Sequence, residues 1–368
     1  MNKLQQTLAH IGALDEQAMA AASARQDELT KPKGSLGRLE ELSIRVAGIT
    51  EDPLPRIRDK AVIVMAGDHG VAVEGVSAYP SEVTPQMVYN FLRGGAAINV
   101  LARHVGARVV VVDMGVATDL EPHPDLLVRK IGYGTRSFAV GPAMTRDEAV
   151  KSIEVGIEVV EAEIARGLDI VGTGDMGIGN TTPSSAIVAA MTGAPVASVT
   201  GRGTGLDDRG LRNKIQIIER SLELNRPDPE DPLDVLAKVG GFEIGGLAGV
   251  MLGAAASRVP VVIDGFISGA AALIATGLCP RLADFLIAAH NSVEIGHRTM
   301  LGRMGLVPLF DFNLRLGEGT GAVLAISMVE AATKILSEMA TFSEAGVSEA
   351  VETAEAGDVP STLRKGEG

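Results

Sequence analysis

The sequence predicts an α/β fold, in which helices cover both faces of a parallel, Rossmann-like sheet. Two observations predict it. Short β-branched apolar runs recur along the chain, and each ends in an acidic residue or a glycine turn. Alanine-rich stretches with helical spacing lie beside most of them, and this alternation is typical of a sheet buried on both faces. The apolar runs occupy residues 61–65, 108–112, 168–171, 259–263 and 306–310.

The turns that follow these runs predict where a ligand binds. In open parallel sheets, ligands bind beyond the carboxyl ends of the strands. That rule places the five turns along one edge of the sheet. Glycines and polar side chains in these turns are therefore the first candidates for a functional site.

The two ends of the chain follow a different pattern. Residues 1–57 have an amphipathic helical pattern that ends near two prolines, with a polar turn at 31–38. The last long helix is expected at about 321–338, where apolar residues again have helical spacing. Residues 351–368 are acidic and small, so a solvated tail is expected there.

Composition limits the class of protein. The chain is 46% hydrophobic but only 3% aromatic and has no tryptophan, so its core must be aliphatic. The formal charge is −13, whereas a nucleic-acid-binding protein would normally have a basic surface. A single cysteine, Cys279, excludes a disulfide framework and argues against a cysteine-based zinc site. It is expected to be an inert buried thiol.

The sequence shows neither an N-terminal signal segment nor a membrane-spanning segment. The N-terminus has no apolar signal core. The most apolar region, 245–279, is interrupted by Arg258, Pro260 and Asp264, so it is too short to span a membrane. A cytoplasmic protein is expected.

A glycine motif follows the third apolar run. Residues 172–177 match G-x-G-x-x-G, which suggests a dinucleotide fold. That fold also needs an acidic residue at the end of the next strand, and residues 195–200 contain none. A more general prediction remains, because residues 177–183 lead into a helix whose N-terminus suits a phosphate. A tight turn with a threonine cap is the structural alternative.

A second glycine-rich loop, at 201–205, precedes the cations Arg209, Arg212 and Lys214. Backbone amides beside cations suit an oxyanion. The alternative is an ordinary loop followed by a solvated helix face. Two such loops in one chain favour a phosphorylated ligand.

Glu318 lies between two glycines just before the last long helix. It could simply cap that helix. The flanking glycines, however, leave the carboxylate open to a ligand, and Leu314 and Leu316 would supply apolar walls. Burial raises the pKa of a carboxyl group and a helix N-terminus lowers it, so this setting suits a general base.

Residues 79–87 follow the first strand and could hold a planar base. The polar groups of Ser81, Glu82 and Gln86 could orient it, with Tyr79 and Met87 beside it. A capped loop and helix start is the alternative. Templates for a zinc protease, a P-loop, a hydrolase elbow and the twin-acid loop that binds magnesium and pyrophosphoribose are all absent from the sequence.

Six motifs, in this order along roughly residues 5–350, together resemble the nicotinate-nucleotide–dimethylbenzimidazole phosphoribosyltransferase family. They are KPKGSLG at 31–37, AGDHG at 66–70, GIGNTTP at 177–183, GRGTG at 201–205, NSVEIGH at 291–297 and LGEGTG at 316–321. The resemblance implies a large α/β domain at 58–321, a small helical domain from 1–57 and about 322–350, and a homodimer.

The resemblance also implies a reaction. The 5-phosphoribosyl group of nicotinate mononucleotide would pass to 5,6-dimethylbenzimidazole, giving α-ribazole 5′-phosphate and nicotinate, in assembly of the nucleotide loop of cobalamin. Nicotinate leaves as a neutral pyridine nitrogen, so no metal, cofactor or general acid is expected. This agrees with the missing twin-acid loop.

The family's residues map onto this sequence as follows. The catalytic base maps onto Glu318. A second acid, usually glutamate, is Asp175 here, one methylene shorter. The phosphate and ribose would bind at Gly177, Ile178, Gly179, Asn180, Thr181, Gly203 and Lys214, and the base beside Tyr79, Ser81, Glu82, Gln86 and Leu316.

Other functions stay open at this point. The same fold and chemistry could use adenine, another benzimidazole or a phenol as acceptor. A dinucleotide-dependent oxidoreductase and a non-catalytic nucleotide sensor are the alternatives from other classes.

Overall fold

A parallel sheet forms the centre of the computed structural model, which describes residues 1–348. Its strand order is β3-β2-β1-β4-β5-β6, and each pair of neighbours is parallel. The predicted α/β class is therefore confirmed. The order reverses between β1 and β4, which is where doubly wound sheets bind ligands. The strands are β1 (Lys60–Gly67), β2 (Ala107–Gly115), β3 (Leu126–Val128), β4 (Ile170–Met176), β5 (Val261–Ile263) and β6 (Leu286–Ala288).

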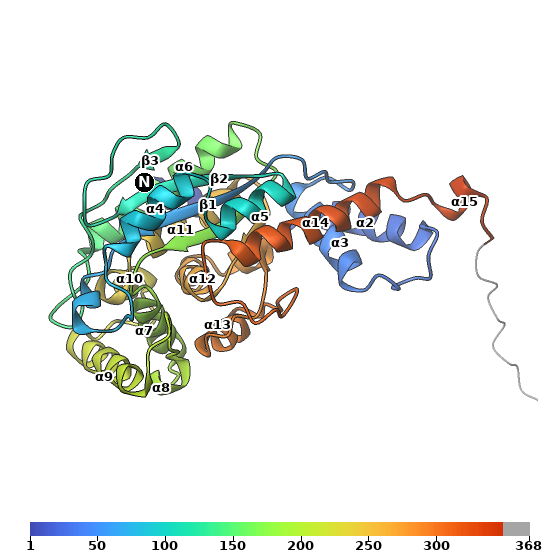
Figure 1. Ribbon diagram of the computed structural model, residues 1–368. Coiled ribbons are helices and arrows are strands. Elements are labelled where there is room, and N and C mark those ends of the chain that lie inside the picture. The colour runs from blue at the N-terminus through green and yellow to red at the C-terminus, as the bar shows by residue number, and fades with distance from the viewer. Residues whose placement is uncertain (349–368) are drawn as a thin grey trace, which may run out of the picture.

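Helices cover both faces of the sheet (Figure 1). They are α1 (Lys3–His10), α2 (Glu16–Glu28), α3 (Arg38–Thr50), α4 (Val83–Leu92), α5 (Ala97–Val105), α6 (Arg146–Ile164), α7 (Thr181–Thr192), α8 (Val196–Val199), α9 (Asp208–Asn225), α10 (Pro232–Val239), α11 (Phe242–Ala256), α12 (Phe266–Leu278), α13 (Gly296–Met304), α14 (Thr320–Glu338) and α15 (Phe342–Ala345). Two 3₁₀ helices span Gly70–Glu74 and Pro280–Phe285.

The central strands are mostly apolar because helices cover both faces of the sheet. In β1, Ile63 and Met65 pack with α6 and α11 in one core, while Val62 and Val64 pack with α4, α5 and α14 in the other. Every residue of β1 is buried. Side chains alternate between faces with a period of two, so a run without polar residues fills both cores.

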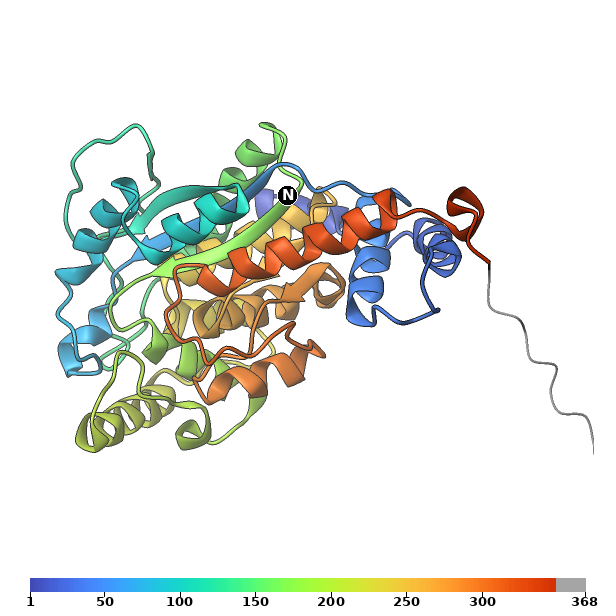
Figure 2. The same ribbon diagram turned by 45° about the vertical axis from the view of Figure 1, so that its right-hand side comes forward.

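The two chain ends meet beyond the sheet. Figure 2 shows α2 and α3 beside the far end of α14, projecting from the body, while α1 lies among the helices of the body. An antiparallel bridge pairs Leu29 with Thr341. In the turn before α3, Lys31 forms a salt bridge of 2.8 Å with Glu40, and both side chains are nearly inaccessible. These contacts agree with a small helical unit built from both ends, although the exact domain boundaries stay a prediction.

Helix α14 was expected near its observed bounds. By length and hydropathy alone α14 could cross a membrane, but 56% of its apolar stretch is buried against the rest of the protein. It contacts β4 and β5. A long apolar helix is therefore explained by its place in the core. The tail predicted at 351–368 lies outside the described residues.

Two local predictions were wrong. Residues 306–310 form no strand; Pro308 lacks an amide hydrogen, and a single bridge joins Phe310 to His290. Cys279 is partly exposed rather than fully buried. The strands β3 and β6 were missed because each contains one β-branched residue, whereas the run at 259–263 that predicted β5 contains four.

Close packing of α6 on α11 depends on glycine. A Cβ at Gly156 would collide with the carbonyl oxygen of Gly246 and lie 3.0 Å from the Cα of Gly249. The two helix backbones therefore touch, and neither helix can move away without disturbing the sheet beneath.

We expect Gly156→Ala to destabilise the fold by about 1–3 kcal/mol, because the added methyl group forces two packed helices apart. A lower Tm in thermal unfolding at a fixed scan rate would show this. Gly302→Ala is the matched control, since its Cβ would meet no atom within 4 Å on the exposed face of α13. That variant should unfold at the same temperature or slightly higher. Equal Tm values for wild type and Gly156→Ala would contradict the prediction.

Candidate active site

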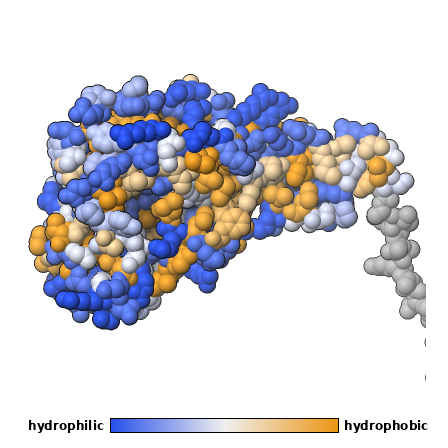
Figure 3. Space-filling view, viewed as in Figure 1, coloured by the Kyte–Doolittle hydropathy of each residue, from blue (hydrophilic) through white to orange (hydrophobic). Residues whose placement is uncertain are grey.

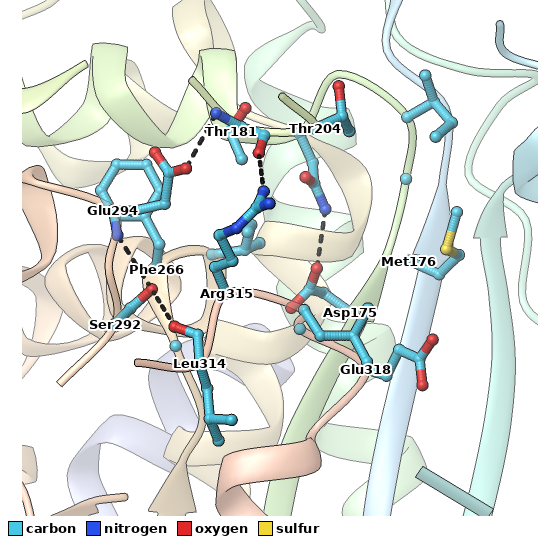
Figure 4. A pocket seen from close by; sticks show the side chains of 18 of the residues that line it. Asp175, Met176, Thr181, Thr204, Phe266, Ser292, Glu294, Leu314, Arg315 and Glu318 are labelled. Carbon is cyan, nitrogen blue, oxygen red and sulfur yellow. Dashed lines mark hydrogen bonds between the residues drawn. The ribbon is translucent and has the colours of Figure 1, made fainter. Parts of the chain in front are cut away.

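A cavity of about 690 Å³ opens at the carboxyl ends of β4, β5 and β6. Its walls come from the segments that follow these strands, from α4 and from the loop before α14 (Figure 4). The predicted edge of the sheet is therefore where the cavity lies. Of the proposed site residues, Tyr79, Asp175, Gly177, Ile178, Asn180, Thr181, Gly203, Leu316 and Glu318 line it.

Glu318 is held in a strained turn. Gly317, Glu318 and Gly319 have φ angles of +83°, +62° and +91°, a left-handed conformation that is costly for a residue with a Cβ. The Glu318 side chain is only 5% exposed, and its Oε2 accepts a hydrogen bond of 3.2 Å from the amide of Ile98. Burial raises the pKa of Glu318, and the Ile98 amide opposes that rise. The helix N-terminus that acts on this carboxylate is therefore α5, not α14 as the sequence suggested.

Asp264, which directly follows β5, caps α14 from a distance. Its two carboxylate oxygens accept hydrogen bonds from the amides of Gly319 (3.2 Å) and Ala322 (2.9 Å). The N-cap residue of α14 is Gly319, which has no side chain to do this. Burial raises the pKa of Asp264 to about 7, although these amides lower it. Asp264 thus anchors the turn that carries Glu318.

Asp175, in the last part of β4, lies beside the same turn. Asn180 donates a hydrogen bond of 2.9 Å to Oδ2 of Asp175, and a Cβ on Gly317 would lie 3.1 Å from that oxygen. Burial, followed by the charge of Asp264, raises the pKa of Asp175 well above its usual range. Asp175 and Glu318 therefore line one buried end of the cavity, with Asp264 bonded to the turn behind them, and this favours a positively charged ligand atom there.

The other end of the cavity favours an anion. Lys214 of α9 is fully buried, and its Nζ donates a hydrogen bond of 2.6 Å to Oγ1 of Thr181 at the start of α7. Within residues 1–348, no carboxylate oxygen lies within 4.0 Å of this ammonium group. Burial lowers the pKa of Lys214 to about 8. A buried cation beside a helix N-terminus is costly unless a ligand supplies the negative charge.

The sequence missed several residues that complete this end. The Gly203 amide donates a hydrogen bond of 2.9 Å to Oε1 of Glu294, and Arg315 donates one of 3.2 Å to the Gly203 carbonyl (Figure 4). Ser292 bonds the Leu314 carbonyl. Glu294 and Ser292 lie in the NSVEIGH motif, which carried part of the family resemblance but suggested no role by itself. Arg315 had no recognisable signal, because a lone arginine after a leucine is common.

The apolar wall of the cavity differs in part from the prediction. Tyr79, Val83, Met87, Met176 and Leu316 line it. The structure does not bring Ser81, Glu82 and Gln86 into the cavity; all three are exposed. On α4, Val83 and Met87 line the cavity, whereas Gln86 lies at the edge of the same helix face and is exposed to solvent.

The AGDHG motif lies behind the cavity rather than in its wall. His69 Nε2 is 2.7 Å from Oε1 of Glu243, and both side chains are inaccessible. Burial lowers the pKa of His69, but the charge and hydrogen bond of Glu243 together with the charge of Asp68 raise the pKa overall. A Cβ on Gly177 would lie 3.2 Å from this imidazole. The pair therefore supports the loop that begins at Gly177.

Comparisons with known proteins agree with this geometry. A family model described as Phosphoribosyltransferase matches residues 11–347. The nicotinate-nucleotide–dimethylbenzimidazole phosphoribosyltransferase of Roseiflexus sp. (strain RS-1) is 68% identical over 352 residues, which cover 96% of this chain and 100% of that protein. The chain belongs to this family. The enzyme of the same name from Geobacter sulfurreducens is 60% identical over 349 residues, covering 95% of this chain and 99% of that protein.

Solved structures extend the agreement to the fold. The crystal structure of the family member from Thermus thermophilus matches with a TM-score of 0.87 and 48% sequence identity, covering 92% of this chain and 100% of that one. Membership in the family makes this chain a glycosyltransferase-type enzyme. The roles of the individual site residues stay predictions.

We expect Lys214→Met to weaken binding of ribose 5-phosphate by about tenfold or more near neutral pH, because a charged hydrogen-bond donor is lost. Lys214 is protonated below its pKa of about 8 and loses its charge as the pH rises through that value. Wild-type affinity should therefore fall through about pH 8, and the variant should lack that part of the fall. Isothermal titration calorimetry measures both effects.

Lys151→Met is the control, because it removes one exposed lysine on α6. It should bind like the wild type. Equal affinity of wild type and Lys214→Met across the pH range would place the anion elsewhere.

Proposed function

We propose that the protein transfers the 5-phosphoribosyl group of nicotinate mononucleotide to 5,6-dimethylbenzimidazole, releasing nicotinate and α-ribazole 5′-phosphate for the lower ligand of cobalamin. One observation carries the proposal. A strained, buried glutamate between two glycines faces a cavity whose opposite end is lined by Thr181, which accepts a hydrogen bond from the buried Lys214. The names of the relatives, at 60–68% identity over nearly their whole length, support this substrate pair.

The cavity orders the substrates by charge. The phosphate group would bind Lys214, Thr181 and the amide groups at the start of α7. The ribose would then lie toward Asp175, and the planar acceptor would pack against the apolar wall at Met87, Met176 and Leu316.

The carboxyl groups act on the reacting carbon. The ribosyl carbon of the nucleotide becomes positively charged as nicotinate departs, and buried carboxylates at Asp175 and Glu318 stabilise that charge. Nicotinate leaves as a neutral pyridine nitrogen, so no proton has to be delivered to it. Attack on the opposite face of the ribose gives the α-glycoside.

Glu318 acts as the general base. The attacking nitrogen of the benzimidazole forms a bond to the ribosyl carbon while the proton on the ring's N–H passes to the Glu318 carboxylate. The raised pKa of Glu318 makes it a better proton acceptor, and the hydrogen bond from the Ile98 amide favours its ionised form. Burial and the Ile98 amide thus act in opposite directions on the pKa of Glu318, as a general base requires.

The remaining expectations belong to the same proposal. The enzyme is expected to be a cytoplasmic homodimer that needs no cofactor or metal. The projecting unit of α2, α3 and distal α14 supports a dimer, because hydrophobic residues gather on its surface (Figure 3). Leu54, which follows α3, is 40% exposed. Another acceptor base of the same planar shape is the second candidate, because the wall that faces it is apolar and has no fixed polar contact from Ser81 or Gln86.

We expect Glu318→Gln to lower kcat by about 10²–10⁴-fold, because the amide cannot accept the proton. The assay measures nicotinate release and α-ribazole 5′-phosphate formation, with EDTA present to test the absence of a metal. Glu338→Gln is the matched control. Glu338 lies exposed at the far end of α14, the helix that Glu318 precedes, so this variant should retain full activity. A fully active Glu318→Gln variant, or an inert wild type, would refute the assignment.

We expect Asp264→Asn to lower kcat by about 10–100-fold with little change in KM for nicotinate mononucleotide. The asparagine keeps only one acceptor oxygen for the two amides, so the Glu318 turn shifts, and small displacements of reacting groups are costly. Steady-state kinetics separate the two constants. A rise in KM without loss of kcat would show that Asp264 acts on substrate binding instead.

A further inference from the structure

Glu294 places a carboxylate in the part of the cavity that otherwise suits an anion. It is 8% exposed, and its Oε1 accepts a hydrogen bond from the Gly203 amide. Within residues 1–348, its Oε2 is buried without a hydrogen-bond partner. Buried oxygens of this kind are rare and call for an explanation. One oxygen of Glu294 is enough to accept the hydrogen bond from the Gly203 amide. That structural contact therefore does not explain the second, buried oxygen.

Neighbouring glycines make room for this side chain. A Cβ on Gly201 would collide with the Glu294 carboxylate. A Cβ on Gly203 would lie 2.7 Å from Oγ1 of Thr181 and 3.4 Å from Nζ of Lys214. The carboxylate therefore lies against Gly201, while the threonine hydroxyl and the ammonium group lie against Gly203, so all three groups border the space beside this loop. Glu294 lines the cavity, and its unpartnered oxygen can accept a hydrogen bond from a ligand there.

The charges in this space decide which anion fits. Lys214 contributes one buried positive charge, and Arg315 is exposed and screened by solvent. Glu294 cancels the lysine, so a phosphate dianion would add two uncompensated negative charges. A phosphate monoanion adds one, and its remaining hydroxyl can donate a hydrogen bond to the carboxylate.

We infer that Glu294 makes this a site for a phosphate group that carries a proton, with the P–OH donating to the Glu294 carboxylate. The inference rests on the proposed function, in which this end of the cavity holds the phosphate of nicotinate mononucleotide. No bond to phosphorus or oxygen is broken, and the proton stays on the phosphate. Sulfate, which has the same shape but no proton near neutral pH, leaves the two negative groups facing each other.

Other titratable groups face the same cavity. They are Asp175 on β4, His290 beside the NSVEIGH motif, and Arg315 and Glu318 in the loop before α14. Lys214 on α9 bonds Thr181 of the cavity wall, and His297 is buried within the motif. Burial lowers the pKa of His297 to about 3, so it stays neutral near pH 7. Lys214 titrates at about pH 8, but its charge attracts phosphate and sulfate alike. The ratio of the two affinities at one pH therefore isolates the effect of Glu294.

Isothermal titration calorimetry with inorganic phosphate and with sulfate tests the inference without any catalytic step. At about pH 6 we expect the wild type to bind phosphate at least about tenfold more tightly than sulfate, which is the usual worth of a charged hydrogen bond. Raising the pH to about 8 should weaken phosphate binding more than sulfate binding, because the phosphate loses its proton. The ratio should therefore shrink.

In Glu294→Gln the ratio at about pH 6 should fall to within about threefold, because the amide can donate to sulfate. Glu294→Asp keeps the charge and should still reject sulfate. Glu219→Gln, on the exposed face of α9, is the matched control and should behave like the wild type. Thermal unfolding of each variant checks that it is folded.

A wild type that binds both anions equally would overturn the inference, as would a Glu294→Gln variant that still rejects sulfate. In either case nicotinate release by the wild type would leave the proposed function intact. If neither anion binds and no nicotinate is released, the proposed function fails as well. Wild-type discrimination needs no substitution, so the test does not depend on any variant folding.

Discussion

The cap that Asp264 places on α14 is the interaction on which the site depends. A helix N-terminus leaves amides without partners, and here the N-cap residue is a glycine that cannot bond them. An aspartate at the end of a strand bonds two of those amides from outside the helix. The helix is thereby tied to the sheet edge, and the left-handed turn before it has only one arrangement. That arrangement turns Glu318 into the cavity.

Charge is distributed along the cavity in a way that the whole fold supports. The ends of β4 and β5 bring Asp175 and Asp264 to one side, and α9 brings Lys214 to the other. Burial makes each of these groups harder to ionise, which shows in the raised pKa of both acids and the lowered pKa of the lysine. Such shifts cluster at functional sites because a bound substrate supplies the missing opposite charge. A substrate with an anionic end and a carbon that becomes cationic matches both sides.

Glycine is used here for proximity more than for flexibility. Gly156 lets two helices touch beneath the sheet, and Gly174 lets β4 approach the backbone of Glu318. Gly201 admits the carboxylate of Glu294. The high glycine content of the chain therefore reflects close contacts that bring the site together as well as turns after the strands.

The sequence by itself determined the α/β class, the two glycine loops and the setting of Glu318 between glycines. These follow from local chemistry: apolar runs fill buried strands, and glycines permit positive φ. Motifs in order were enough to indicate the family. Strand β6 was missed, because its three residues include only one β-branched side chain. Only the tertiary structure decided which side chains meet. Asp264 caps α14 from another strand, Ile98 rather than α14 stabilises the Glu318 carboxylate, and Glu294 joins Gly203 from a distant motif. Contacts between segments far apart in the chain depend on how the layers are arranged, and no local pattern encodes them.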